Sequence, residues 1–273
     1  MASNELMNKK VFIFDMDGTI YLGEQPLPNA VDFINKLDKR YIFFSNNASR
    51  DSAYYLEKLH KMGFKVTKDQ ILTSANVLIK FLKTHRMGKK VFVLGTSHLQ
   101  NMFEENGIEL FDCDLYEKSD MLNLPDIVVT SFDTKLTYDR LERACTYIRN
   151  GAEWLTTHPD VNCPVEYGYI PDCGAINELI RVSTGKPLPK VFGKPHGEVV
   201  DMLEEITGEK RSNMVIFGDR LYTDIALGKK NNMMAVLLLT GEATLDDSLE
   251  VQEYLRPDKV FQDFFDVEEY YNS

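Results

Sequence analysis

Short apolar runs alternate with helix-like stretches along this chain, and that alternation limits the folds it can adopt. The runs are three to five residues long and rich in valine, isoleucine, leucine and phenylalanine; they include Val11–Phe14, Tyr41–Phe44, Val91–Leu94, Ile127–Val129, Val215–Phe217 and Ala235–Leu239. Amphipathic stretches of helical length separate them. Strands that alternate with helices build βαβ units, so the sequence predicts an α/β protein with a doubly wound, Rossmann-like parallel sheet.

The polar residues that follow these runs are informative, because ligands of such sheets bind beyond the carboxyl ends of the strands. Asp15, Asp17 and Gly18 follow the first run, and Ser45 and Asn46 follow the second. Lys194 follows the apolar pair Val191-Phe192, and Asp219 and Asp224 follow Val215–Phe217. We expect these side chains to meet at one edge of one sheet.

The sequence Gly-Lys-Pro occurs twice, so the choice of Lys194 needs an argument. The first copy, Gly185–Pro187, follows a helix-like stretch, where Gly185 is typical of a helix C-terminus and Lys186 of the surface. The second, Gly193–Pro195, follows an apolar pair and opens a new amphipathic stretch, and proline suits the first turn of a helix. We therefore select Lys194.

This set of side chains is suited to holding a phosphoryl group. Several carboxylates in one pocket repel each other, and a hard divalent cation such as Mg²⁺ removes the conflict because it prefers oxygen ligands. Lys194 adds a fixed positive charge for a phosphate oxygen. Ser45, Asn46 and the backbone N–H groups at Gly18-Thr19 add neutral donors. The sequence thus predicts Mg²⁺ as cofactor and a small phosphorylated metabolite as substrate.

The two aspartates after the first run suggest different roles. A carboxylate can attack phosphorus and form an aspartyl-phosphate, and Asp15 is the more rigidly held candidate because it directly follows the strand. Asp17, two residues on, can protonate the leaving alcohol and then deprotonate the hydrolytic water. Gly18 permits close approach of the backbone to the substrate.

The segment Asp15–Thr19 resembles the first motif of the haloacid dehalogenase (HAD) superfamily of phosphatases. Ser45–Asn47, Gly193–Pro195 and Gly218–Asp224 resemble its second, third and fourth motifs, in the same order. The resemblance implies Mg²⁺ held by Asp15, the Asp17 backbone carbonyl and Asp219, with Asp224 in support. It also implies phosphate held by Ser45, Asn46 and Lys194.

The motif spacing is most similar to that of the NagD / 4-nitrophenylphosphatase branch, in which a large C2-type cap is inserted between the second and third motifs. Ser45 and Lys194 lie 149 residues apart, which matches such an insert. We expect residues 1–80 and 188–273 to form the catalytic core and residues 81–187 an α/β cap. The resemblance places a specificity loop late in the cap, with His158, Asp160, Asp172 and Cys173 as the candidate residues.

The composition of the chain limits which classes of binding partner and which cellular compartment we expect for this protein. The net charge of −11 argues against nucleic-acid binding and against docking on anionic lipid. The longest apolar run, Met233–Leu239, is too short to span a membrane, and the first ten residues lack the apolar core of a secretion signal. Four cysteines without CxxC spacing fit a reducing compartment, so we expect a cytoplasmic protein. Homo-oligomer formation stays open.

Three alternatives to a phosphatase remain at this point. A phosphotransferase or phosphomutase would use the same residues with a second hydroxyl in place of water. A signalling receiver also takes up phosphate on an aspartate, although a single domain of that kind would not need the predicted insert. A degenerate binding or scaffold protein would be expected to lack one of these side chains, and this chain contains them all: Asp15, Asp17, Lys194 and Asp219.

Overall fold

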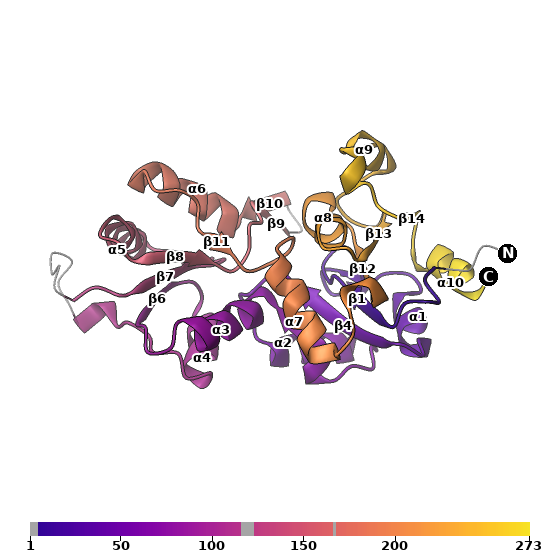
Figure 1. Cartoon of the computed structure of the whole chain (residues 1–273), viewed down its shortest axis with the longest axis horizontal. Helices are drawn as coiled ribbons and strands as arrows, with labels where there is room; N and C mark the ends of the chain where they lie inside the picture. The colour runs from indigo at the N-terminus through magenta and orange to yellow at the C-terminus, as the bar shows by residue number, and fades with distance from the viewer. Residues whose placement is uncertain (1–4, 116–122, 166–167) are drawn as a thin grey trace. The chain divides into compact units, whose positions relative to one another are not determined.

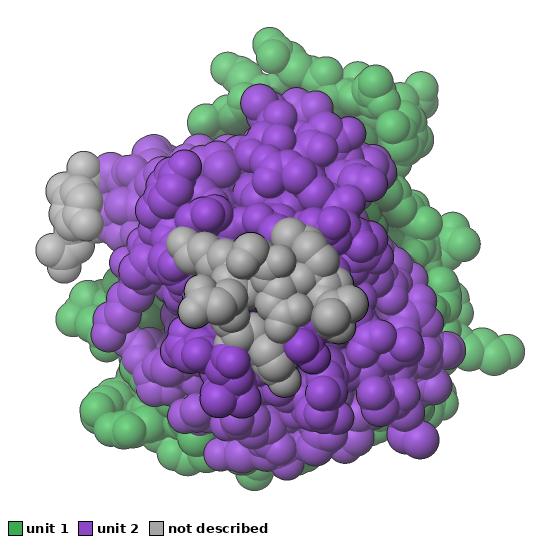
Figure 2. Space-filling view, turned by 90° about the vertical axis from the view of Figure 1, so that its left-hand side faces the viewer, with its two compact units in different colours: residues 1–45, 52–72, 194–273 green, residues 46–51, 73–193 purple. Residues whose placement is uncertain are grey.

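The computed structural model describes residues 5–115, 123–165 and 168–273. The chain forms two compact units, coloured separately in Figure 2. The first contains residues 1–45, 52–72 and 194–273, and the second contains residues 46–51 and 73–193. None of the helices in the described ranges is both long and apolar enough to cross a membrane.

The first unit is built on a six-stranded sheet with the order β14-β13-β12-β1-β4-β5. Its strands are β1 (Val11–Phe14), β4 (Arg40–Ser45), β5 (Ile71–Thr73), β12 (Met214–Gly218), β13 (Met234–Leu238) and β14 (Lys259–Phe261). The strand β1 is central and pairs in parallel with β12 on one side and β4 on the other. Its four residues are all buried, which explains why the run is apolar throughout.

Helices cover this sheet (Figure 1). They are α1 (Ala30–Lys36), α2 (Ser52–Lys61), α7 (Gly197–Thr207), α8 (Ala226–Lys230), α9 (Leu245–Glu250) and α10 (Phe264–Asn272). Leu221–Ile225 forms one π-helical turn before α8, and β2 (Tyr21–Leu22) pairs with β3 (Gln25–Pro26) in a small hairpin. Aromatic rings dominate the core under α1 and α10: Phe14 stacks on Phe217 at 4.9 Å between ring centroids, and Phe33 packs against Phe264.

The second unit has its own four-stranded parallel sheet, with the order β11-β8-β7-β6. Its strands are β6 (Val91–Leu94), β7 (Ile127–Thr130), β8 (Glu153–Thr156) and β11 (Lys190–Val191). Its helices are α3 (Ser74–His85), α4 (Ser97–Glu105), α5 (Tyr138–Arg149) and α6 (Cys173–Thr184). The strands β9 (Asn162–Val165) and β10 (Gly168–Pro171) form an antiparallel hairpin between β8 and α6. In Figure 1, α5 and α6 lie on one side of the sheet and α3 and α4 on the other.

The prediction of an α/β fold with parallel sheets is confirmed, and each predicted strand is found within about one residue of its expected bounds. The features that were not predicted include the β2–β3 hairpin, the β9–β10 hairpin and the helix α9. The predicted boundaries of the core and cap, at residues 80 and 188, remain predictions; in the structure the chain passes from one compact unit to the other after residues 45, 51, 72 and 193.

Candidate active site

Asp15 lies where β1 ends, held by bonds to both its backbone and its side chain. Its backbone N–H donates to the Phe217 carbonyl of the neighbouring strand at 2.9 Å. One carboxylate oxygen accepts a hydrogen bond from the Thr19 hydroxyl at 3.2 Å, and the other pairs with the Lys194 ammonium. Asp15 is only 8% exposed, so its carboxylate has little freedom to turn away.

Lys194 is 2% exposed and places its ammonium between two carboxylates. It pairs with Asp15 and, at 2.6 Å, with Asp224, and it also donates to the Phe44 carbonyl. Burial lowers the pKa of Lys194, but the charges of Asp15 and Asp224 outweigh burial and raise it overall. The lysine therefore stays positively charged at neutral pH.

The other Gly-Lys-Pro copy, Gly185–Pro187, directly follows the helix α6 of the second unit. Gly185 adopts the left-handed conformation, with φ of 69°, and caps the C-terminus of α6. Lys186 is exposed to solvent. These placements agree with the reasons for which Lys194 was selected.

Asp219 and Asp224 complete a buried acidic cluster with Asp15. One carboxylate oxygen from each of the three lies within 4.8 Å of the others. Burial, with the nearby Asp15 charge, raises the pKa of Asp219 to about 6, and burial raises that of Asp224 to about 7 despite the opposing charge of Lys194. The Lys194 ammonium pairs with two of these three clustered carboxyl groups, and a divalent cation would neutralise the negative charge that remains; oxygen ligands suit Mg²⁺. The residues present fit such an ion.

Asp219 is held by a cradle of backbone that the sequence did not reveal. The Glu242 N–H donates to its Oδ2 at 2.8 Å, and the Thr19 hydroxyl donates to its Oδ1 at 3.1 Å. A Cβ added to Gly241 would lie 2.0 Å from Oδ2, and one added to Gly18 would lie 2.4 Å from it. Both positions must be glycine, because any side chain would displace the carboxylate.

The loop that supplies part of this cradle follows β13. The Thr240 hydroxyl donates to the Gly18 carbonyl at 2.7 Å, so one loop is bonded both to the segment after β1 and to Asp219. The signal that could have found Thr240 and Gly241 is their place directly beyond the carboxyl end of a strand.

Asp17 is partly buried beside a tyrosine and a lysine. The Tyr21 hydroxyl donates to its Oδ2 at 3.2 Å. Burial raises the pKa of Asp17, against the opposing charge of Lys58. Gly18, the next residue, has a φ of +85°, a conformation that glycine adopts readily.

Ser45 and Asn46 follow β4 and are both buried. Ser45 is the last residue of the strand in the first unit, whereas Asn46 is counted with the second unit. The Asn46 side-chain amide donates to Asp160 at 3.0 Å, and the Asn46 backbone carbonyl accepts from the Ser74 hydroxyl at 2.6 Å.

The four residues predicted to govern specificity come together inside the second unit. His158 is fully buried, with Nε2 2.9 Å from Asp172 and Nδ1 2.8 Å from the Thr157 hydroxyl. Asp172 caps α6 by accepting from the Cys173 N–H. Cys173 is buried, and burial raises the pKa of its thiol to about 12. The assignment of these residues to substrate contact stays a prediction.

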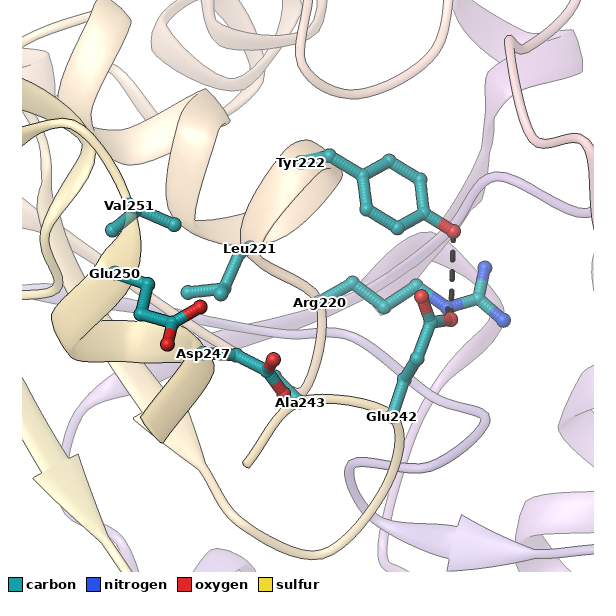
Figure 3. A pocket seen from close by; sticks show the side chains of 8 residues that line it. All are labelled: Arg220, Leu221, Tyr222, Glu242, Ala243, Asp247, Glu250 and Val251. Atoms are coloured by element: carbon teal, nitrogen blue, oxygen red, sulfur yellow. Dashed lines mark hydrogen bonds and ion pairs between the residues drawn. The ribbon is translucent and has the colours of Figure 1, made fainter. Parts of the chain in front are cut away.

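A separate cavity of about 410 Å³ lies next to the Asp219 segment in the first unit. It is lined by the turn at 220–222 and by residues 242–251 (Figure 3). At one end the side chains of Arg220, Tyr222 and Glu242 converge, with Arg220 Nε 3.0 Å and the Tyr222 hydroxyl 3.4 Å from the same Glu242 oxygen. This contact anchors Glu242, whose backbone N–H holds Asp219.

Comparison with known families agrees with the motifs. The sequence profile of the haloacid dehalogenase-like hydrolases matches residues 12–109, and a second profile described as HAD-hydrolase-like matches residues 191–267. The two matches cover the segments that contribute Asp15, Ser45, Lys194 and Asp219.

Individual relatives cover nearly the whole chain. An acid sugar phosphatase from Staphylococcus saprophyticus is 31% identical over 89% of this chain and 91% of its own. The crystal structure of a 4-nitrophenylphosphatase from Thermotoga maritima is 37% identical, with a TM-score of 0.88 over 97% of this chain and 98% of that one. A glycerol phosphate phosphatase from Mycobacterium tuberculosis, solved with magnesium, is 27% identical, with a TM-score of 0.87 over 96% of this chain and 77% of that one. The chain thus belongs to the haloacid dehalogenase-like hydrolases, and among them to the phosphatases related to NagD and the 4-nitrophenylphosphatases.

Proposed function

We propose that this protein hydrolyses small phosphate monoesters, with Mg²⁺ as cofactor and with a covalent aspartyl-phosphate on Asp15. The observation that carries the proposal is the setting of the Asp15 carboxylate at the end of β1, between Lys194 and Thr19 and beside Asp219 and Asp224. Sugar and polyol phosphates are the substrates we favour, because the relatives include an acid sugar phosphatase and a glycerol phosphate phosphatase.

The metal would be held by the Asp15 and Asp219 carboxylates and the Asp17 backbone carbonyl, with Asp224 in support. Bound there, Mg²⁺ would neutralise negative charge on the phosphoryl group and orient it toward Asp15. The all-oxygen donor set supports this choice of ion.

In the first half-reaction, an Asp15 oxygen attacks phosphorus and the bond from phosphorus to the ester oxygen breaks. Asp17 gives its proton to the departing alkoxide, a role that its raised pKa supports because the carboxyl group holds the proton more readily. Lys194 and the Ser45 hydroxyl, with the adjoining Asn46, bind the phosphoryl oxygens. The Gly18 N–H, which the sequence suggested as a further donor, instead donates to the Tyr21 carbonyl at 2.9 Å, and the Thr19 N–H donates to the Met16 carbonyl.

In the second half-reaction, the Asp17 carboxylate takes a proton from water, and the resulting nucleophile attacks phosphorus. The bond between phosphorus and the Asp15 oxygen then breaks, which releases inorganic phosphate and restores Asp15 as a carboxylate and Asp17 as an acid. All of these side chains except Asn46 belong to the first unit, to which we assign the chemistry.

The test is hydrolysis of a panel of sugar, polyol and nitrophenyl phosphates by the wild-type protein and the Asp15→Asn variant, with Mg²⁺ or EDTA. We expect metal-dependent release of phosphate by the wild type and none above background by the variant, because an amide does not attack. After a single turnover in ¹⁸O-water we expect the label in the released phosphate, because water attacks phosphorus; label in the Asp15 carboxylate would show that water attacked its carbonyl carbon instead. Normal turnover by Asp15→Asn would disprove the covalent route.

A further inference from the structure

The Asn46 side chain is fixed on both sides of its amide group. Its Nδ2 donates to Asp160 Oδ1 at 3.0 Å, and the two residues are 4% and 5% exposed although 114 positions separate them in the chain. A carboxylate can only accept, so the amide nitrogen must face Asp160 and the amide oxygen must face away. On that other side lies Gly193, where an added Cβ would come within 2.6 Å of Asn46 Oδ1.

Asp160 is itself held in place by the start of α6. Its backbone carbonyl accepts from the Gly174 N–H at 2.7 Å, and a Cβ on Gly174 would lie 2.3 Å from the Pro159 carbonyl. Two residues earlier, buried His158 is bonded to Asp172, the N-cap of the same helix. The loop from 157 to 160 is therefore tied to α6 at two points, and it presents the Asp160 carboxylate to Asn46 in one fixed direction.

From this geometry we propose that Asp160 is a positioning residue that acts through Asn46 on the phosphate group, rather than a residue that selects the leaving group. The inference rests on the proposed function, in which Ser45 and Asn46 bind phosphate. Asp160 and Gly193 fix the Asn46 side chain, and Ser74 holds its backbone carbonyl, so the orientation of Asn46 directly after Ser45 is fixed. Every substrate shares the phosphoryl group, so a defect in this support should affect all substrates alike.

The experiment compares Asp160→Ala and Asp160→Asn with wild type and with Val161→Ala, a control at an exposed position of the same loop. Loss of the acceptor leaves the buried Asn46 N–H₂ group without its bond to Asp160, and we expect kcat/KM to fall about 5- to 100-fold. The factor should be similar for 4-nitrophenyl phosphate, a sugar phosphate and glycerol phosphate. The dissociation constant of inorganic phosphate, measured by calorimetry with Mg²⁺, should rise in parallel.

Asp160→Asn separates the hydrogen bond from the charge. The carboxamide oxygen at position 160 can still accept from Asn46, so we expect this variant to stay within about threefold of wild type. A role for the negative charge of Asp160 in contacting a leaving group or a cation predicts instead that Asp160→Asn fails as badly as Asp160→Ala.

A double-mutant cycle measures the coupling directly. Because Asp160 acts through Asn46, the variant Asn46→Ala with Asp160→Ala should lose no more activity than Asn46→Ala alone. The side-chain amide signal of Asn46 in a ¹⁵N spectrum, assigned by its loss in Asn46→Ala, should move in Asp160→Ala and stay unchanged in Val161→Ala. This signal reports on the contact without any turnover.

Three results would overturn the proposal: losses that differ strongly between substrates with unchanged phosphate binding, additive losses in the cycle, or an unmoved Asn46 signal. An inactive wild type would refute the proposed function instead, and the phosphate-binding and ¹⁵N measurements would still decide the role of Asp160. If Asp160→Ala does not fold, Asp160→Asn and Asp160→Glu decide it, since the longer side chain of glutamate displaces the acceptor and should weaken phosphate binding.

Discussion

The side chain of Asp17 is where proton transfer can be tested apart from the attack on phosphorus. Replacing it with asparagine removes the proton donor but keeps the size of the side chain and its place beside the Tyr21 hydroxyl. We expect Asp17→Asn to lower kcat for alkyl phosphates by about 10²- to 10⁴-fold, the usual contribution of a general acid or base. The comparison is steady-state kinetics on a polyol phosphate and on 4-nitrophenyl phosphate.

Nitrophenolate leaves without needing a proton, so its ester should suffer less from the loss of Asp17 in the first half-reaction. Asp17→Glu, which keeps a carboxyl group at a longer reach, is a suitable companion variant. Equal losses for both esters would argue that Asp17 does not protonate the leaving group.

Gly241 offers a second test at the scale of one residue. The methyl group introduced by Gly241→Ala would start 2.0 Å from Asp219 Oδ2, well inside contact distance, so the carboxylate must move. We expect the Mg²⁺ concentration for half-maximal activity to rise more than about tenfold, the size of effect seen when the support of a metal ligand is lost. A titration of activity against Mg²⁺ measures it.

Gly88→Ala is the matched control for that change. Its φ of +73° is strained for alanine, but the added Cβ would meet nothing within 4 Å. It should lower the melting temperature without altering the Mg²⁺ requirement. If Gly241→Ala behaves in the same way, the cradle does not position Asp219.

Among the elements, the C-terminal part of α7 carries a testable ion pair. Arg211 donates to both Glu204 oxygens, at 3.1 and 2.6 Å, and its backbone N–H donates to Glu204 at 2.7 Å. These bonds lower the pKa of Glu204 to about 2 from an ordinary 4.5. The stabilisation is fully present above the unfolded-state pKa and is lost as the pH falls from about 4.5 toward 2.

Glu204→Gln should therefore lower the free energy of unfolding at pH 7 by no more than about 1 kcal/mol, because the pair is partly exposed to solvent. Its difference from wild type should shrink when urea unfolding is repeated at pH 3.5. Glu269→Gln, at an exposed position on α10, should differ from wild type at neither pH. A Glu204→Gln deficit that stays constant with pH would show that packing, not charge, is responsible.

The elements that were predictable share a physical trait. Strands buried on both faces are apolar at every position, as in β1 and β12, so their ends and the residues beyond them stand out in the sequence. The β9–β10 hairpin has exposed positions, including Tyr169, and gives no such contrast. Helix α9 is short and polar, although the capping box formed by Thr244 and Asp247 could have predicted where it begins.

The residues of the candidate site also differ in how well the sequence predicts them. Asp15, Asp219 and Asp224 were predictable because they follow strands of one sheet. Lys194 follows β11, a strand of the other sheet, so the expectation of a single sheet was wrong for this residue, although its ammonium pairs with Asp15 and Asp224. The contact between Asn46 and Asp160 was not, since it depends on how the loop after β8 bonds to α6. The place of Thr240 and Gly241 after β13 marks them as candidates for the site, but their close approach to Asp219 depends on the path of the loop, which the sequence does not show.

For the whole molecule, metal binding and stability should be linked. An ion that neutralises the Asp15, Asp219 and Asp224 cluster binds the folded chain and not the unfolded one, so Mg²⁺ at about 100 times its dissociation constant should add about 2.7 kcal/mol. For a chain of this size that corresponds to a rise of about 5–10 °C in melting temperature relative to EDTA, measurable by calorimetry.

The variant Asp219→Asn should lose most of this shift. Ca²⁺ should also stabilise the protein but should not support turnover, because it favours more ligands and bidentate carboxylates and would occupy the Asp15 oxygen that must attack. Full activity with Ca²⁺ alone would contradict the proposed arrangement of the site.

The central strand β1 has a consequence for how the protein is made. Val11 of β1 pairs with Met214 of its partner β12, so β1 leaves the ribosome long before the strand that covers this edge has been synthesised. Asp15 can pair with Lys194 only after residue 194 has been synthesised. The two other carboxylates of its cluster follow later still, at positions 219 and 224. During most of translation the nascent chain therefore has an unpaired edge of β1 and lacks part of the acidic cluster. The cluster becomes complete only when β12 and the residues after it have been synthesised, which is also when that edge can be paired.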